Sequence, residues 1–180
     1  MAVKEIKIYG ETCLKQICVP VEDFGVEEKN LAQDMIQTMY AVRGIGLAAP
    51  QVGVLKRIIV LDVEQLKGKF QPIVLFDPEV LPLTKSGDGS PRGANYTFEE
   101  EGCLSIPGIR EKVKRADRII VRAWDLDGKS VQLKTRNLMS RVILHEIDHL
   151  DGILFVERVD FFRRLFLRPK LKKIKKEAGG

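Results

Sequence analysis

The sequence predicts an α+β fold in which mainly antiparallel strands pack around a central helix, with a further helix at the C-terminus. Strand-like runs follow one another without the regular strand–helix alternation of a parallel sheet. Apolar side chains recur at helical spacing over 26–42 and over 136–152. Asp127-Gly128 lies between two alternating runs within 118–135 and predicts the turn of a hairpin.

The first half of the chain contains elements expected to lead into the core. Residues 3–9 should form a short strand or an extended lead-in, and strands are predicted over 57–63 and 72–78. GIGLAAPQ, residues 44–51, is small and apolar, so it is expected to be a tight turn or a backbone segment that approaches a ligand closely. A dinucleotide-binding loop is disfavoured because Pro50 would disrupt the helix that should follow.

The remaining segments connect and follow the second helix. Residues 81–98 are rich in glycine, serine and proline, and the middle of this stretch is predicted to be an exposed loop. Gly152 is well placed to end the helix, and residues 153–159 are expected to be short and extended. Residues 161–180 are expected to form a basic C-terminal helix or tail, which carries the chain's excess of basic residues.

Length and composition bound the class of protein. A chain of 180 residues with 44% hydrophobic and 31% charged residues fits one soluble globular domain over 1–180. No apolar run could span a bilayer and the N-terminus lacks the apolar core of a signal peptide, so we expect a cytoplasmic protein without a membrane partner. Cys13, Cys18 and Cys103 are too few for a disulfide framework.

The stretch HEIDHLDG, residues 145–152, holds both histidines of the chain. On a helix, positions i and i+4 project from the same face, so His145 and His149 can bind one metal ion beside Glu146, which is able to move a proton. Leu138 and Val142 continue the same stripe. The alternative is a chance match, with both histidines satisfied by ordinary hydrogen bonds.

A catalytic metal site commonly uses three protein ligands and a water, so a third ligand is needed. The chain has no other histidine, and Phe155 stands where one would follow HExxHxxG. Glu157 and Glu177 are the only glutamates after the helix, and neither has the expected separation from His149. Cys103 remains as the candidate, since a thiolate binds divalent transition metals strongly.

Three motifs occur in this order: GIGLAAPQ, EGCLS at 101–105 and HEIDHLDG. With YGETCLKQICVPV at 9–21 and RVILHEIDHLDGILF at 141–155, the chain resembles the peptide deformylases over nearly its whole length. The resemblance implies a metal-dependent hydrolase. Its substrates would be N-formylmethionyl nascent peptides, from which it removes the formyl group and releases formate.

The resemblance also implies the roles of individual residues. The metal ligands would be Cys103, His145 and His149, with Glu146 as the catalytic acid/base, and with Gln51 and the backbone N–H of Leu104 as stabilisers of the reacting oxygen. The predicted peptide site comprises Ile45, Gly46, Gly102, Arg110, Leu138 and Val142. These ligands could hold one Zn²⁺, Fe²⁺, Ni²⁺ or Co²⁺ ion, and the resemblance implies Fe²⁺, with loss of activity on oxidation.

Two departures from the family pattern concern the surroundings of the site. Leu144 stands where many relatives have glutamine, just before the first metal histidine. The segment between Gln51 and Glu101 is longer than in compact relatives, and its loop near residues 87–95 is expected to alter the rim of the site.

The basic tail predicts salt-sensitive contact with RNA phosphates, and the resemblance makes the ribosome, not DNA, the expected partner. Deleting Lys170–Gly180 is expected to weaken ribosome binding and to spare turnover of a free formyl-peptide. A solvated surface helix without a partner is the alternative for the tail. The alternative functions are another metallohydrolase, such as a peptidase, and a non-catalytic binding module stapled by metal.

Overall fold

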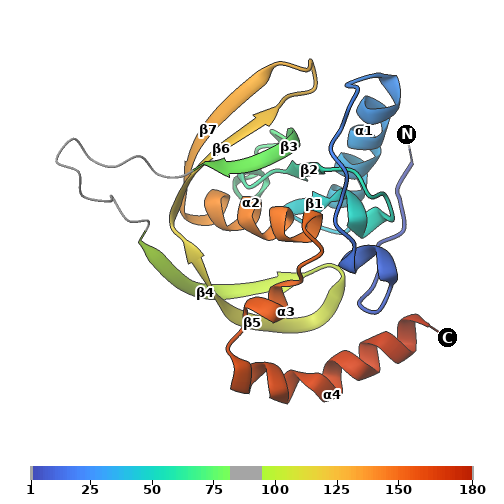
Figure 1. The fold of residues 1–180 in the computed structure, drawn as a ribbon, viewed down its shortest axis with the longest axis vertical. Helices are drawn as coiled ribbons and strands as arrows, with labels where there is room; N and C mark the ends of the chain where they lie inside the picture. Colours follow the sequence, from blue (N-terminus) through green and yellow to red (C-terminus); the bar gives the residue numbers. More distant parts are fainter. Residues whose placement is uncertain (1, 82–94, 180) are drawn as a thin grey trace.

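The computed structural model describes residues 2–81 and 95–179 (Figure 1). Within these residues a larger sheet has the strand order β1-β2-β3-β6-β7, and a smaller one pairs β4 with β5. All of these pairings are antiparallel, which confirms the predicted α+β class. The strands are β1 Gly46–Ala48, β2 Ile58–Leu61, β3 Ile73–Leu81, β4 Tyr96–Cys103, β5 Ile106–Ala116, β6 Arg118–Trp124 and β7 Ser130–Arg136.

The central helix α2 lies between the two sheets, and the C-terminal helix α4 lies beyond the smaller sheet (Figure 1). None of the described helices is both long and apolar enough to cross a membrane. The α-helices are α1 Val26–Ala41, α2 Asn137–Leu150, α3 Phe155–Arg158 and α4 Phe161–Ala178, and the 3₁₀ helices are η1 Thr12–Lys15, η2 Ala49–Val52 and η3 Glu64–Lys67.

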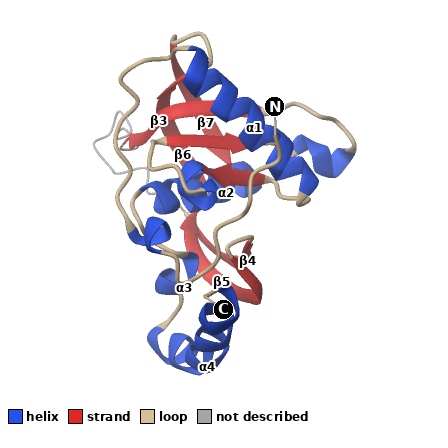
Figure 2. Cartoon of the chain, turned by 90° about the vertical axis from the view of Figure 1, so that its right-hand side faces the viewer, coloured by secondary structure: helices blue, strands red, loops and turns tan. Residues whose placement is uncertain are grey.

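The larger sheet is covered on both faces, which explains why β2 reads as an unbroken apolar run. Ile58 and Val60 pack in the same core cluster as Met35 and Met39 of α1. The intervening side chains of β2 point to the other face and pack with Ile143 and Ile147 of α2. A third cluster joins the smaller sheet to α3 and α4, the two helices that lie beside it in Figure 2. The helix that carries the histidines therefore packs against the larger sheet through Ile143 and Ile147, and it also contacts β5 of the smaller sheet.

Two predicted elements differ in the structure. Residues 153–159 are not extended, because the helix α3 occupies their middle. The Glu157 carboxylate accepts a hydrogen bond from the Leu154 N–H at 2.9 Å, which caps this short helix at its start. GIGLAAPQ is not a simple turn either, since it contains the edge strand β1 and then η2. Residues 3–9 form the extended lead-in, without a strand.

The strand β5 was missed by the sequence analysis. Pro107, Gly108 and a dense run of charges argue against a strand there, yet residues 110–116 pair with β4 one by one, and Ile106 pairs with Cys103. Tyr96–Phe98, at the end of the stretch rich in glycine, serine and proline, belong to β4. The predicted loop near 87–95 lies almost entirely outside the described residues.

Candidate metal centre

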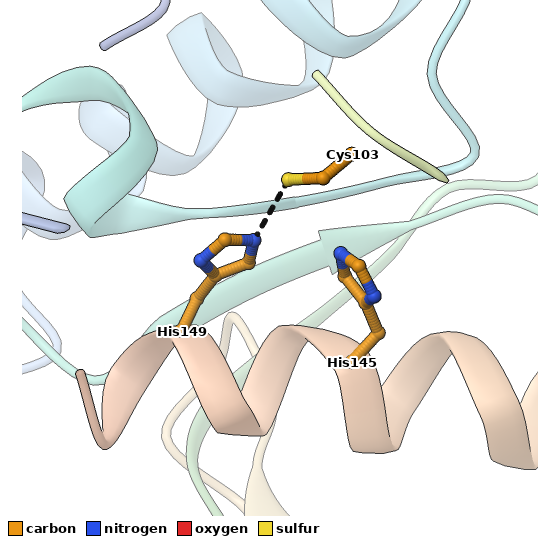
Figure 3. A group of neighbouring side chains, drawn as sticks. All are labelled: Cys103, His145 and His149. Atoms are coloured by element: carbon orange, nitrogen blue, oxygen red, sulfur yellow. Dashed lines mark hydrogen bonds between the residues drawn. The ribbon is translucent and has the colours of Figure 1, made fainter. Parts of the chain in front are cut away.

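Three side chains with metal-binding donor atoms converge between α2 and the end of β4 (Figure 3). The imidazoles of His145 and His149 project from the same face of α2 toward Cys103. The Cys103 Sγ lies 3.2 Å from the His149 Nε2, and one donor atom from each of the three residues lies within 4.8 Å of the others. A thiolate and two imidazoles at this spacing fit a single divalent transition-metal ion.

A tight turn presents Cys103 to the helix. The register of β4 and β5 shifts between Gly102 and Cys103, and Cys103 then pairs with Ile106 across the two intervening residues. A bulge of this kind re-aims the side chains beside it. The carbonyl of Ser105 in the turn accepts a hydrogen bond from the Tyr9 N–H at 2.8 Å, so the extended N-terminal segment fastens the turn in place.

Glu146 lies between the two histidines in sequence and is buried beside them. Its Oε2 has no hydrogen-bond partner among the described residues. A buried carboxylate oxygen without a partner is costly, which fits a site that receives another polar group at this point. A Cβ atom on Gly46 would lie 2.5 Å from Glu146 Oε1, so only glycine lets β1 approach the helix this closely.

The side-chain amide of Gln51 is held in one orientation. Its Oε1 accepts a hydrogen bond from the Ala48 N–H at 2.8 Å. Its Nε2 therefore faces the site, 3.3 Å from Ser105 Oγ and 3.5 Å from Cys103 Sγ. A neutral N–H donor is thus aimed at the group of metal-binding side chains.

A cavity of about 610 Å³ opens onto this group. Its lining includes all six residues predicted for the peptide site, which are Ile45, Gly46, Gly102, Arg110, Leu138 and Val142. Gln51, Cys103, Leu104, His145 and Glu146 also line it, whereas His149 lies behind them and is buried. Arg43, Glu100 and Arg141 are lining residues that the sequence analysis did not select.

Comparison with known proteins shows the family of the chain. The sequence model of one family, described as polypeptide deformylase, matches residues 3–164. The chain is 40% identical over 176 residues to a peptide deformylase from Acidobacterium capsulatum, covering 98% of each chain. The chain belongs to the peptide deformylase family. Peptide deformylases are metalloenzymes that remove the N-formyl group from nascent peptides, and this is the activity of the chain.

Solved structures of peptide deformylases share the fold. The structure from Thermus thermophilus matches with a TM-score of 0.84 at 40% identity, covering 98% of this chain and 99% of that one. The structure from Legionella pneumophila matches with a TM-score of 0.84 at 36% identity, covering 99% of this chain and 98% of that one.

In this deformylase a buried carboxylate, that of Glu101, supports the first histidine. The Glu101 Oε2 lies 3.0 Å from the His145 Nδ1, which turns the Nε2 of that ring toward Cys103 and His149. Arg115 of β5 donates to both oxygens of the Glu101 carboxylate at 2.9 and 3.0 Å, and Arg141 of α2 donates at 2.7 Å. Arg115 also contacts Asp148, which pairs in turn with Arg158.

Sequence reasoning did not find this network, although Glu101 stands in the EGCLS motif. The run Glu99–Glu101 resembles an exposed acidic stretch, and only the alternation of β4 turns Glu101 inward. Leu144, the departure from the family pattern, packs against the core cluster between α2 and the larger sheet.

The network and the histidines alter the acidity of the site. Burial opposes the charged form of Glu101, but hydrogen bonds from His145 and Arg115 outweigh it and lower the pKa to about 2. Burial likewise opposes a Cys103 thiolate, yet the adjacent imidazoles hold the thiol pKa well below its usual value. Burial raises the pKa of Glu146 to about 7, against the opposite effect of His145 and His149.

Replacing Arg115 by methionine should lower the free energy of unfolding by about 3–5 kcal/mol, because Glu101 and Asp148 would remain buried without their shared cation. Urea unfolding followed by circular dichroism, with chelator present in every sample, measures the change. The matched control is Arg122→Met on β6, which removes an exposed pair with Glu79 and should cost about 1 kcal/mol at most. Equal costs for the two variants would contradict the prediction.

Proposed function

We propose that Cys103, His145 and His149 hold one divalent ion, and that Glu146 is the acid/base of formyl hydrolysis. The convergence of the three donor atoms within 4.8 Å, beside a cavity lined by Cys103 and His145, is the observation that supports this assignment. Bound by these three residues, a divalent ion would activate water for attack near neutral pH.

In this proposal, Glu146 takes a proton from the attacking water as the new bond forms at the formyl carbon. Negative charge grows on the formyl oxygen, where the Gln51 Nε2 and the Leu104 N–H donate hydrogen bonds to it. The carbon–nitrogen bond then breaks, and Glu146 returns the proton to the leaving amine. One water and one formyl-peptide thus yield formate and a peptide with a free amino terminus.

We further propose that Ile45, Leu138 and Val142 form the walls of the methionine slot. All three line the cavity, and Val142 lies one helical turn before Glu146. Gly46 of β1, Gly102 of β4 and Arg110 of β5 line the same cavity and would border the bound peptide.

Glu146→Gln should lower kcat for formate release from formyl-Met-Ala-Ser by at least about 10²-fold, because the amide cannot accept the proton. Metal analysis should still find one ion per chain, since all three ligands remain. Asp151→Asn, at the end of the same helix, is the matched control and should keep wild-type activity. Wild-type kcat in Glu146→Gln would instead show that Glu146 is not the acid/base of the reaction.

We propose Fe²⁺ as the native ion. Mixed thiolate and imidazole donors accept several divalent ions, so the ligands alone do not select iron. The lowered pKa of Cys103 favours the thiolate that such a site requires.

Protein prepared without oxygen should contain iron, and its activity should fall on exposure to air. The measurement is elemental analysis together with formate release after each of Fe²⁺, Zn²⁺, Ni²⁺ and Co²⁺ is restored to chelated protein. Full activity with zinc and none with iron would overturn this assignment.

We also propose that α4 binds ribosomal RNA near the emerging chain, which implies a cytoplasmic location. The support is the density of exposed basic residues on its C-terminal half: Lys170, Lys172, Lys173, Lys175 and Lys176. Deletion from Lys170 onward is a poor test, however, because Leu171 is buried in the core cluster under the smaller sheet. Charge substitutions leave that packing intact.

The double variant Lys172→Gln/Lys176→Gln should bind ribosomes more weakly, and the dependence of log K on log salt should become shallower by about 1–2. Titrations of labelled protein against ribosomes across a salt series measure both quantities. Lys29→Gln/Lys134→Gln, which removes the same charge from α1 and β7, should leave the slope unchanged. An unchanged slope in the α4 variant would count against the RNA contact.

A further inference from the structure

Arg43 occupies a backbone conformation that usually belongs to glycine. It follows the last turn of α1 with a φ of 57°, in the left-handed region. The Arg43 N–H donates to the Tyr40 carbonyl at 3.0 Å, and the Gly44 N–H donates to the Met39 carbonyl at 2.8 Å. These two bonds form a Schellman motif, whose left-handed position is normally glycine or asparagine.

The fold therefore does not require an arginine here. The backbone bonds of the motif would form equally well with glycine, which takes this conformation without steric cost. A residue that breaks a local preference without a structural gain marks a position at which to look for function. The question is what the guanidinium of Arg43 does.

Arg43 lines the cavity that leads to Cys103 and the two histidines. Its neighbour Gly44 packs against the turn after β4, since a Cβ on Gly44 would lie 2.9 Å from the Leu104 side chain. The Gly44 carbonyl also accepts a hydrogen bond from Gln65 at 2.7 Å. The base of the Arg43 side chain is thus held firmly at the edge of the cavity.

The arginine side chains that line the cavity differ in whether they have an ion-pair partner. Arg110 pairs with Glu100 at 3.7 Å, and Arg141 is buried against Glu101. Arg43 is exposed and has no ion pair with any residue in 2–81 or 95–179. An unpaired cation remains at the edge of a cavity that receives a peptide.

We propose that Arg43 is a specificity-determining residue that favours substrates with an acidic side chain shortly after the formylmethionine. The inference rests on the proposed role of the cavity as the peptide site. A carboxylate on the second or third residue of the peptide supplies the partner that Arg43 lacks within the protein. The guanidinium remains in contact with solvent, so the preference is modest and sensitive to salt.

The experiment compares C-terminally amidated peptides, formyl-Met-X-Ser and formyl-Met-Ala-X, with X as Asp, Ala or Lys. Amidation removes the terminal carboxylate, which would otherwise compete for the same cation. In about 0.05 M salt the wild type should prefer Asp to Lys by about two- to fivefold in kcat/KM, in at least one series. The difference should reside in KM, with kcat unchanged, because the contact is far from the formyl carbon.

Arg43→Gly and Arg43→Gln should bring the Asp:Lys ratio close to one, Arg43→Lys should retain part of it, and Arg43→Glu should invert it. Arg43→Gly suits the backbone, so its thermal unfolding temperature should not fall. Lys29→Gln, which removes one charge near the other end of α1, should keep the wild-type ratio. In about 1 M salt, where the Debye length is about 3 Å, the wild-type preference should vanish.

The Ala peptides separate this inference from the activity itself. If no formate is released from any Ala peptide, the assignment of the cavity fails. If Ala, Asp and Lys peptides are cleaved equally well by the wild type, or if Arg43→Gly keeps the wild-type ratio, the role of Arg43 is wrong. A loss of preference in Lys29→Gln would also overturn it, because net charge and not position would then be responsible.

Discussion

The carboxylate of Glu101 joins the three parts of the molecule that form the site. It lies on β4, it accepts hydrogen bonds from Arg115 of β5 and Arg141 of α2, and it contacts the Nδ1 of His145. Burying these charges is costly, and a protein in which well-packed hydrophobic side chains replace all of them can be equally stable. What the charged network provides instead is orientation, because an imidazole held at its Nδ1 can direct its Nε2 at one point only.

Packing on either side of α2 makes this orientation durable. The larger sheet covers one side of the helix through a core cluster, and Arg141 and His145 contact Glu101 of the smaller sheet on the other side. The helix therefore cannot turn or shift without breaking both sets of contacts. Gly46 allows β1 to lie against Glu146, and the extended N-terminal segment is bonded to Gln51 and to the turn after Cys103. The groups proposed to act on the formyl carbon therefore come from three separate segments, which are α2, η2 and the end of β4 with the turn after it.

The outer features of the site are less constrained. Arg43 lies at the edge of the cavity without a partner among the described residues, and Arg110 and Glu100 form an exposed pair that also lines it. Such groups contribute little to the stability of the fold, so they are free to influence which peptides bind. The basic half of α4 is similar, since Leu171 secures the helix while the lysines around it face solvent.

The sequence by itself determined what depends on local spacing. Histidines four residues apart on a helix share a face, alternating apolar runs become strands, and the absence of any other suitable residue left Cys103 as the third candidate ligand. Only the tertiary structure decided which charged residues are buried and which are paired. Glu101 and Arg115 look like surface residues in the sequence because their partners lie on other elements. The strand β5 was missed because its pairing with β4 outweighs its weak intrinsic strand signal. The helix α3 was expected to be extended because the sequence did not reveal the local cap that begins it. Arg43 differs from Glu101 and Arg115, because the structure leaves it exposed and not buried. Its left-handed backbone, its place beside the cavity and its lack of an ion pair with any described residue follow from where α1 ends in the fold.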